Sequence, residues 1–406
     1  MTRQATADWS LDDFNVPETP GRDRFHDFAL PLPLMRAIFD LGFEYCTPIQ
    51  SETLPYSLAD YDVTGQAQTG TGKTAAFLIS ILTQFWESPL AEDLPMGCPR
   101  ALILAPTREL ALQIEGDAKG LSRYMEERTV CVVGGMDFQN QLKKLEKKPV
   151  DILVATPGRL IDFLERRAVN LKHVEVLVID EADRMLDMGF IPDVRRIVYQ
   201  TPHKRRRQTL FFSATFNDDV MRLANSWTID PKHVVIEPEQ VATDTVEQKF
   251  WMVSTSEKAE ILAKVLGQPD VERVIVFANR RDQTHTLVKH LRKAGIECEA
   301  LAGDVPQKKR LATLNRFKDG ELKYLIATDV AGRGIHVEGI SHVINYELPE
   351  DPEDYVHRIG RTGRAGAAGV SISFVSEDNA FDLPAIEEYL GIKVDCTLPE
   401  LELESD

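Results

Sequence analysis

One stretch, VEVLVIDEAD at residues 174–183, places three acids directly after a short, β-branched apolar run. Such a run is typical of a strand buried in a parallel sheet. Ligands of open α/β sheets bind outside the carboxyl ends of the strands, so the acids would stand where a metal–phosphate site is built. A solvated acidic turn is the alternative, and for this stretch alone it is the better interpretation. The rest of the chain has to decide between the two.

Length and composition predict the class of protein. A chain of 406 residues with 43% hydrophobic content predicts two domains of roughly 200 residues, each with a core of its own. The five cysteines show neither a C-x-x-C pair nor a zinc-ligand spacing, which indicates scattered, buried thiols in a reducing compartment. The first ten residues lack the apolar region of a secretory signal, and no apolar stretch approaches the roughly 20 residues of a membrane span. We therefore expect a cytoplasmic protein with no membrane partner.

The net charge of −17 argues against a protein that coats nucleic acid through bulk electrostatics. A local groove can still be basic on an acidic body. Composition alone favours an enzyme that handles a nucleotide or a metabolite.

A phosphate-binding loop is predicted at residues 67–74, AQTGTGKT, between a strand-like segment and the apolar start of a helix. The backbone N–H groups of such a loop cradle phosphates. Lys73 would reach the β- and γ-phosphates, and Thr74 would offer a hydroxyl to Mg²⁺. The first position is Ala67 where the usual pattern has glycine. Phosphate binding remains a better interpretation than a flexible turn.

Apolar runs that end in polar turns recur along both halves, with helical stretches between them, and predict doubly wound parallel sheets. We expect a loose tail at residues 1–24, a first domain at 25–231, a linker at 232–244 and a second domain at 245–406 with an acidic end. The second half has no phosphate-binding loop. The basic run at 204–207, KRRR, is predicted to be a solvated loop, with contact to RNA as the alternative.

The segment HRIGRTGR at residues 357–364 presents two arginines, Arg361 and Arg364, three positions apart. On a helix they would share a face. Arginines from a domain without a phosphate-binding loop fit arginine fingers, which neutralise charge on a γ-phosphate. A basic, glycine-rich surface turn is the alternative.

Together these residues resemble the DEAD-box family of ATP-dependent RNA helicases, over roughly Phe25 to Val375. The resemblance rests on an ordered set of segments: Gly42-Phe43 with 47–50, the loop at 67–74, 106–110, 156–159, 180–183, 213–215 and 357–366. Asp183 separates the chain from related families that carry histidine there. The family resemblance implies two tandem RecA-like domains joined by a short linker.

The resemblance also implies roles for single residues. Gln50 would recognise adenine, Asp180 would hold Mg²⁺ through water, and Glu181 would orient the attacking water and act as base. Asp183 would couple to Ser213 and Thr215. The residues implied for ATP are Phe25, Gln50, Ala67, Gln68, Thr69, Gly70, Thr71, Gly72, Lys73, Thr74, Asp180, Glu181, Arg361 and Arg364. Those implied for RNA are Pro106, Thr107, Arg108, Gly135, Thr156, Arg159, Gly303, Gln307, Arg310 and Thr328.

The implied activity is RNA-stimulated ATP hydrolysis coupled to local unwinding of RNA duplexes, with largely sequence-independent binding and no preference for DNA. Likeness to one bacterial group of the family implies work in RNA degradation with the endoribonuclease RNase E. An RNP remodelling or clamping ATPase in ribosome assembly is the alternative; a DNA translocase and a non-catalytic scaffold fit less well. His336 stands where the family usually has aspartate, and residues 377–406 hold ten acids and Lys393 as their one base.

Overall fold

The computed structural model describes residues 9–68, 70–90, 94–236, 246–303, 305–329, 337, 339–363 and 369–399. The chain divides into two compact units, Met1–Glu237 and Pro238–Asp406, and each is described by itself. None of the helices in the described ranges combines the length and the apolar character that a bilayer crossing needs.

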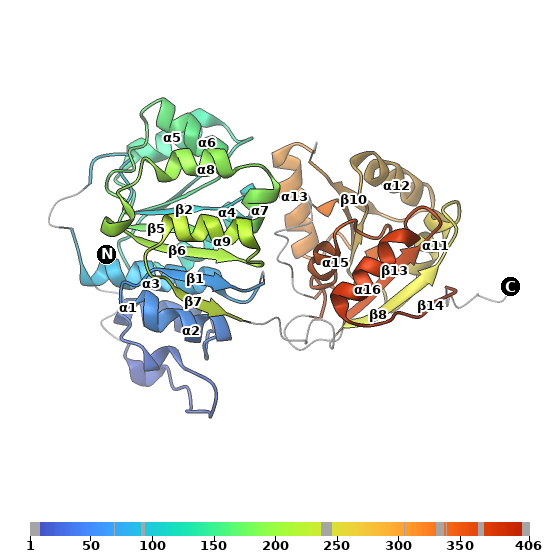
Figure 1. Cartoon of the computed structure of the whole chain (residues 1–406), viewed down its shortest axis with the longest axis horizontal. Helices are drawn as coiled ribbons and strands as arrows, with labels where there is room; N and C mark the ends of the chain where they lie inside the picture. Colours follow the sequence, from blue (N-terminus) through green and yellow to red (C-terminus); the bar gives the residue numbers. More distant parts are fainter. Residues whose placement is uncertain are drawn as a thin grey trace. The chain divides into compact units, whose positions relative to one another are not determined.

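The first unit is built on a seven-stranded parallel sheet with the strand order β3-β4-β2-β5-β6-β1-β7 (Figure 1). Every neighbouring pair runs parallel, which confirms the predicted doubly wound sheet. The strands are β1 (Val63–Gln66), β2 (Ala101–Leu104), β3 (Thr129–Val132), β4 (Ile152–Ala155), β5 (Val176–Ile179), β6 (Gln208–Ser213) and β7 (Lys232–Val235).

Alternate residues of these strands face two separate cores, as the period of two in a strand requires. In β5, Val176 and Val178 pack with one core, and Leu177 and Ile179 pack with the other. Helices α1 (Leu32–Asp40), α2 (Pro48–Ser57), α3 (Lys73–Glu87) and α4 (Arg108–Leu121) cover the first face. Helices α5 (Phe138–Lys147), α6 (Pro157–Glu165), α7 (Ala182–Asp187), α8 (Ile191–Val198) and α9 (Asp218–Trp227) cover the second face.

The N-terminal segment differs from the predicted loose tail. Phe14 and Val16 are buried in the first core, and the Phe14 ring lies 5.4 Å from that of Phe39 on α1. The tail prediction is therefore wrong for residues 9–24, and residues 1–8 lie outside the described ranges. The apolar residues of this segment are spaced with no helical or strand period, so their burial depends on tertiary contacts that periodicity does not reveal.

The linker prediction also needs a correction at its start. Residues 232–235 form β7, which pairs with β1 at the edge of the sheet. Lys232 N–H donates to Asp62 O at 2.8 Å, so the chain is still part of the first unit here. The linker prediction began too early because the short edge strand is half exposed and lacks the apolar run of the inner strands. Residues 237–244 lie outside the described ranges.

The second unit repeats the architecture with a seven-stranded sheet of order β10-β11-β9-β12-β13-β8-β14. Its strands are β8 (Val246–Met252), β9 (Val274–Phe277), β10 (Cys298–Leu301), β11 (Tyr324–Ala327), β12 (His342–Asn345), β13 (Gly369–Val375) and β14 (Cys396–Thr397). Helices α11 (Lys258–Leu266) and α12 (Arg281–Lys293) pack on one face, and α13 (Gln307–Lys318), α15 (Pro352–Ile359) and α16 (Leu383–Leu390) pack on the other. The four cysteines at 46, 98, 131 and 298 are buried and all five are free thiols, as expected.

Candidate ATP site and RNA-contact residues

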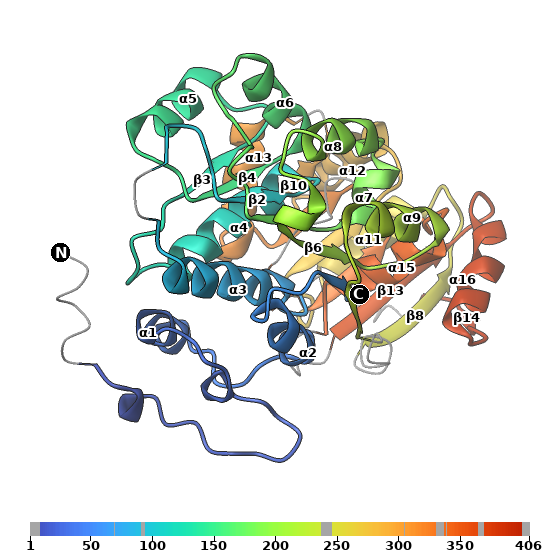
Figure 2. The same cartoon turned by 60° about the vertical axis from the view of Figure 1, so that its left-hand side comes forward.

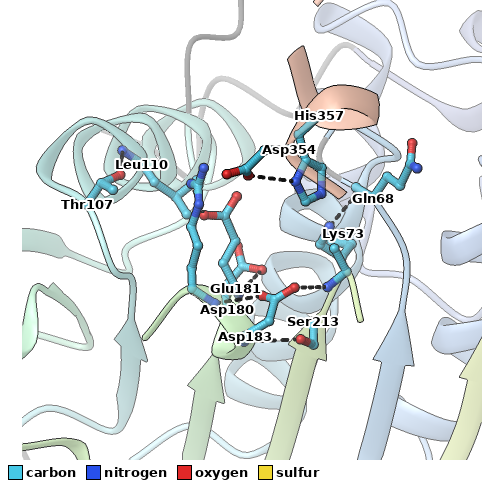
Figure 3. A network of polar contacts seen from close by, with 12 residues as sticks. Gln68, Lys73, Thr107, Leu110, Asp180, Glu181, Asp183, Ser213, Asp354 and His357 are labelled. Carbon is cyan, nitrogen blue, oxygen red and sulfur yellow. Dashed lines mark hydrogen bonds and ion pairs between the residues drawn. The ribbon is translucent and has the colours of Figure 1, made fainter. Parts of the chain in front are cut away.

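The order of the strands brings the predicted ATP residues together. Strand β6 lies between β5 and β1, so the segments that follow these three strands meet at one edge of the sheet. They are the phosphate-binding loop, the acidic quartet 180–183 and residues 213–215. Figure 3 shows Lys73, Asp180, Glu181, Asp183 and Ser213 gathered at the strand tips of the first unit.

The phosphate-binding loop turns sharply before α3. Gly70 and Gly72 have φ angles of 86° and 96°, a left-handed region that favours glycine. The Lys73 ammonium is buried and donates to Ala67 O and Gln68 O, both at 2.6 Å, and the Thr71 hydroxyl donates to Gln68 O at 2.8 Å. To reach a phosphate, Lys73 has to exchange these two carbonyl oxygens for phosphate oxygens. Thr69 lies outside the described residues.

The charges of Lys73 and Asp180 are held in a desolvated site. Burial lowers the pKa of Lys73, and the carboxylates of Asp180 and Glu181 oppose that effect. Burial also raises the pKa of Asp180 to about 7, against the attraction of Lys73 and the hydrogen bond from Glu181 N–H to Asp180 Oδ1 at 3.0 Å. A bound ligand that brings charges of opposite sign would therefore stabilise the charged forms of Lys73 and Asp180.

Mg²⁺ suits these oxygen donors. Magnesium at nucleotide sites is usually held by one or two carboxylates, by substrate phosphates and by water. The buried Asp180 carboxylate, with Thr74 in the first turn of α3, provides such a set. Within the described residues no cluster of three or more His, Cys, Asp or Glu could hold a metal by itself. The residues fit an ion that arrives with a nucleotide.

The predicted base, Glu181, has a buried partner that the sequence analysis did not identify. Glu181 adopts a left-handed conformation (φ 53°, ψ 55°) at the N-cap of α7. Arg184 Nη1 donates to Glu181 Oε2 at 2.5 Å, and the two side chains are only 9% and 6% exposed. Glu181 and Arg184 stand three residues apart, but Glu181 precedes the helix in a left-handed turn, so no helical spacing in the sequence marks this pair.

Asp183 joins the quartet to β6. Its Oδ2 accepts N–H groups from Ala214 at 3.0 Å and Thr215 at 3.1 Å, and its own N–H donates to Ser213 Oγ at 3.2 Å. The structure thus brings together the three residues predicted to couple; the coupling itself stays a prediction.

Gln50 lies against the phosphate-binding loop. Its Oε1 accepts Thr47 N–H at 2.9 Å, and its Nε2 donates to Gly72 O at 3.1 Å. A Cβ at position 72 would lie 2.5 Å from Gln50 Nε2, so a side chain there would displace the Gln50 amide, and the φ of 96° itself favours glycine. Phe25 is fully buried and stacks on Phe43 with ring centroids 6.4 Å apart. Contact of Gln50 and Phe25 with a base stays a prediction.

Four predicted RNA-contact residues of the first unit lie together at the ends of β2, β3 and β4. The Arg108 guanidinium lies over Gly135, where an added Cβ would stand 2.1 Å from Arg108 Nη1. Gly134 N–H donates to Thr156 Oγ1 at 3.4 Å. Arg159 donates to Met136 O through both Nη1 and Nη2 at 3.1 Å. Pro106 and Thr107 follow β2 and are buried, and the Thr107 hydroxyl caps α4 by accepting Leu110 N–H.

In the second unit, Gly303 and Thr328 line a pocket of about 810 Å³ together with Arg280, Arg281 and His285. These three basic side chains come from the segment after β9 and were not assigned a role from the sequence. Gln307 begins α13 and Arg310 lies one turn further along it. The side chain of Gln307 is outside the described part of the chain.

Arg361 does not lie on a helix. Helix α15 ends at Ile359, and Arg361 follows in a turn in which Gly363 has a φ of 70°. The expected helical face shared with Arg364 is therefore wrong, because the glycines break the helix first. Arg361 is buried, and its Nε donates to His357 O at 3.1 Å. Arg364 and His336 lie outside the described residues.

Arg358, which the sequence analysis did not assign, organises this region. Its guanidinium donates to Asp329 through two bonds of 2.6 Å, to Asn279 Oδ1 at 2.7 Å and to Glu347 O at 2.7 Å. These partners follow β9, β11 and β12, so one buried arginine ties α15 to three strands. No local pattern marks such a role, because the partners are up to 79 residues away.

Comparisons with known proteins agree with this architecture. The DEAD/DEAH box helicase model matches residues 47–223, and the helicase conserved C-terminal domain model matches residues 257–366. The ATP-dependent RNA helicases RhlB of Pseudomonas aeruginosa and Pseudomonas putida are 60% and 59% identical over 388 residues, which span 96% of this chain and 98% of each relative.

Solved structures of 30% sequence identity show the same fold. S. cerevisiae Dbp5 bound to RNA and ADP BeF3 matches with a TM-score of 0.80 over 93% of this chain and 95% of that chain. Mss116p bound to ssRNA and AMP-PNP matches with a TM-score of 0.82 over 94% of this chain and 80% of that chain. The two units are therefore RecA-like domains. The chain belongs to the DEAD-box family of ATP-dependent RNA helicases.

Proposed function

We propose that this chain hydrolyses ATP in response to RNA and uses hydrolysis to open short RNA duplexes locally. The observation that carries the proposal is the buried arrangement of Lys73 beside Asp180 and Glu181, with Asp183 tied to the loop after β6. Hydrolysis of the nucleotide bound at Lys73 would therefore act close to Asp183. Asp183 contacts residues 213–215, the segment that family members use to couple nucleotide state to domain closure.

Each residue has a distinct task in the proposed reaction. Lys73 exchanges its bonds to Ala67 O and Gln68 O for phosphate oxygens. Glu181 holds the attacking water and accepts its proton, and Arg361 and Arg364 stabilise the charge that develops on the γ-phosphate. Asp180, through water, and Thr74 would hold Mg²⁺, which would supply further charge neutralisation.

The RNA-contact residues favour recognition of the backbone. Arg108, Thr156 and Arg159 offer cations and hydroxyls beside the exposed main chain of 134–136, and such groups bind phosphates and 2′-hydroxyls rather than base edges. Binding would be largely independent of sequence and selective for RNA over DNA.

Glu181→Gln tests the proposed function. We expect RNA-stimulated hydrolysis to fall by about 100-fold or more, while ATP and RNA binding are retained, because the amide cannot accept the proton. Steady-state phosphate release with and without single-stranded RNA measures the hydrolysis rate. Equilibrium titration measures the affinities for ATP and RNA. Hydrolysis by the variant at the parent rate would show that Glu181 is not the base. Stimulation by DNA equal to that by RNA would exclude an RNA helicase.

We further propose that the protein is cytoplasmic and works with RNase E in RNA degradation. The curated relatives called RhlB, at up to 60% identity, support the proposal through their likeness alone. Affinity purification of the full chain from its own cells tests it. Recovery of RNase E is the expected outcome, whereas recovery of ribosomal precursors in its place would favour RNP remodelling in ribosome assembly.

A further inference from the structure

Positive charge is concentrated in one segment of this acidic chain. Residues 195–207 hold six of its 47 lysines and arginines, one histidine and none of its 64 acids, although the net charge is −17. The segment runs from the end of α8 to the start of β6. A polyanion would be attracted to this segment.

A groove of about 650 Å³ lies along this segment, between α8 and α9. The two helices lie over the same face of the sheet of the first unit (Figures 1 and 2). Val198, Leu223 and Trp227 form part of its apolar floor, and Arg195 and Tyr199 stand on its rim. Asp219, the one acid among the described residues that line it, is paired with Arg222 at 3.5 Å. The groove thus offers apolar contact and positive charge to the same ligand.

Some of the cations build the rim, and others are available to a ligand. Lys204 Nζ donates to Asn225 O and Thr228 O at the end of α9, and Arg207 donates to Pro202 O at 2.7 Å. By contrast, the exposed Arg195, Arg205 and Arg206 form no ion pair with any residue that the structure describes. Arg195 lines the groove, whereas Arg205 and Arg206 follow its lining residue Lys204 in the chain. All three guanidinium groups are free to bind an anion.

Tyr199 adds an aromatic surface beside these cations. It is 88% exposed, more than any other large hydrophobic side chain in the described ranges. An exposed ring next to arginines is the combination with which proteins bind single-stranded nucleic acid, through base stacking and phosphate contacts. An acidic protein segment would use the charges but would leave the ring without a stacking partner.

The groove is separate from the site already described. Tyr199 and the basic run precede β6, whose first residue is Gln208, whereas Ser213 and the ATP site follow its last residue. The amino and carboxyl ends of parallel strands lie at opposite edges of a sheet. RNA held here does not occupy the contacts made by Arg108, Thr156 and Arg159.

We propose that the groove between α8 and α9 is a second RNA site, which holds single-stranded RNA through Arg195, Arg205 and Arg206 and stacks a base on Tyr199. The choice of RNA as the ligand rests on the proposed function. The site tethers a strand to the protein outside the helicase core and in any nucleotide state.

Binding of labelled oligouridine of about 20 nucleotides to the full chain without nucleotide, over a range of salt, tests the proposal. Arg195→Glu/Arg206→Glu should weaken binding at least about tenfold and flatten the plot of log Kd against log salt by about 1.4, because two phosphate contacts are lost. Tyr199→Ala should weaken binding about five- to 100-fold with an unchanged salt slope, and Tyr199→Phe should retain it. A 4-thiouridine oligomer should cross-link within residues 195–207.

The matched control reverses two exposed lysines on α5, Lys143→Glu/Lys147→Glu, and should change the affinity less than about twofold. All variants should keep the parent kcat for ATP at saturating RNA. Parent affinity and slope in the Arg195/Arg206 variant would overturn the proposal, as would a loss of kcat at saturating RNA. Tighter binding of labelled polyglutamate than of oligouridine would assign the groove to a protein segment instead. Failure of RNA to stimulate the ATPase of the parent chain would count against the proposed function, not against the groove.

Discussion

At the scale of single residues, the ATP site is governed by charges that burial makes costly. Removing one member of a buried ion pair leaves the other charge uncompensated, at a cost of about 3–5 kcal/mol. The Glu181–Arg184 pair therefore orients Glu181 strongly, since alternative rotamers would separate the two charges. The family resemblance implied the role of Glu181, but not that of Arg184, whose place beside Glu181 depends on the left-handed turn at position 181.

Arg184 should position Glu181 without touching the substrate. We expect Arg184→Gln to lower the kcat of RNA-stimulated hydrolysis by about 100-fold while the KM for ATP changes little, because a displaced base misaligns the water. Arg184→Lys should recover part of the rate. Steady-state kinetics on folded protein measures both values, with Arg196→Gln as the control, since the Arg196 pairs are exposed. An equal change in kcat for both glutamine variants would rule out the positioning role.

At the scale of elements, a glycine after β3 allows the side chain of Arg108 on α4 to pack closely against the main chain. Gly135 has a φ of 73° and lies under the Arg108 guanidinium, whereas a Cβ on Gly134 would meet Arg108 only at 3.5 Å. The loop after β3 and the start of α4 are thereby held in one arrangement. The family resemblance implied that Arg108 and Gly135 contact RNA. That the Arg108 guanidinium packs on Gly135 could be seen only in the folded structure.

Gly135→Ala should displace Arg108 and weaken the RNA contacts of the first unit. We expect RNA affinity in the presence of a non-hydrolysable ATP analogue to fall about tenfold, and ATP hydrolysis without RNA to stay at the parent level, because the ATP site lies at other strands. Gly134→Ala is the matched control and should keep affinity within about twofold. Equal losses from the two alanines would show that Arg108 placement does not matter for RNA.

The N-terminal segment is a second element whose role can be measured. Phe14 is 5% exposed and Leu11 is 47% exposed. We expect Phe14→Ala to lower the free energy of unfolding of the first unit by about 3–5 kcal/mol and Leu11→Ala by less than about 0.5 kcal/mol. Urea unfolding followed by tryptophan fluorescence measures the difference. An unchanged free energy of unfolding after Phe14→Ala would instead support the interpretation of this segment as a loose tail.

At the scale of the whole molecule, the two units share one architecture, and the proposed reaction draws its residues from both. The strands, their parallel pairing and the residues that follow them could be predicted, because apolar runs, glycine turns and strand-end positions are local signals. The Arg358 network and the burial of Phe14 could not, because they join segments distant in sequence. The spacing of Arg361 and Arg364 left a helix and a glycine-rich turn open, and the end of α15 at Ile359 places Arg361 in the turn.

The division of labour predicts that the second unit contributes to the rate more than to nucleotide affinity. Arg361→Ala should lower RNA-stimulated hydrolysis by about 1,000-fold or more, with ATP affinity within about threefold of the parent value, as for arginine fingers. Single-turnover hydrolysis and nucleotide titration separate the two effects. Arg316→Ala, which removes ion pairs to Glu297 and Glu299, is the control in the same unit and should leave the rate unchanged. Parallel losses of rate and affinity after Arg361→Ala would contradict the finger role.

The contact of Gln50 with Gly72 limits how this protein can evolve. Gln50 is anchored by Thr47 and fills the space that any side chain at position 72 would need. A substitution at any of the three positions would therefore disturb the contacts of the other two, although 22 residues separate Gln50 from Gly72. If Gln50 recognises the base as predicted, a substitution at position 50 that changes base preference also changes the contact with the phosphate-binding loop.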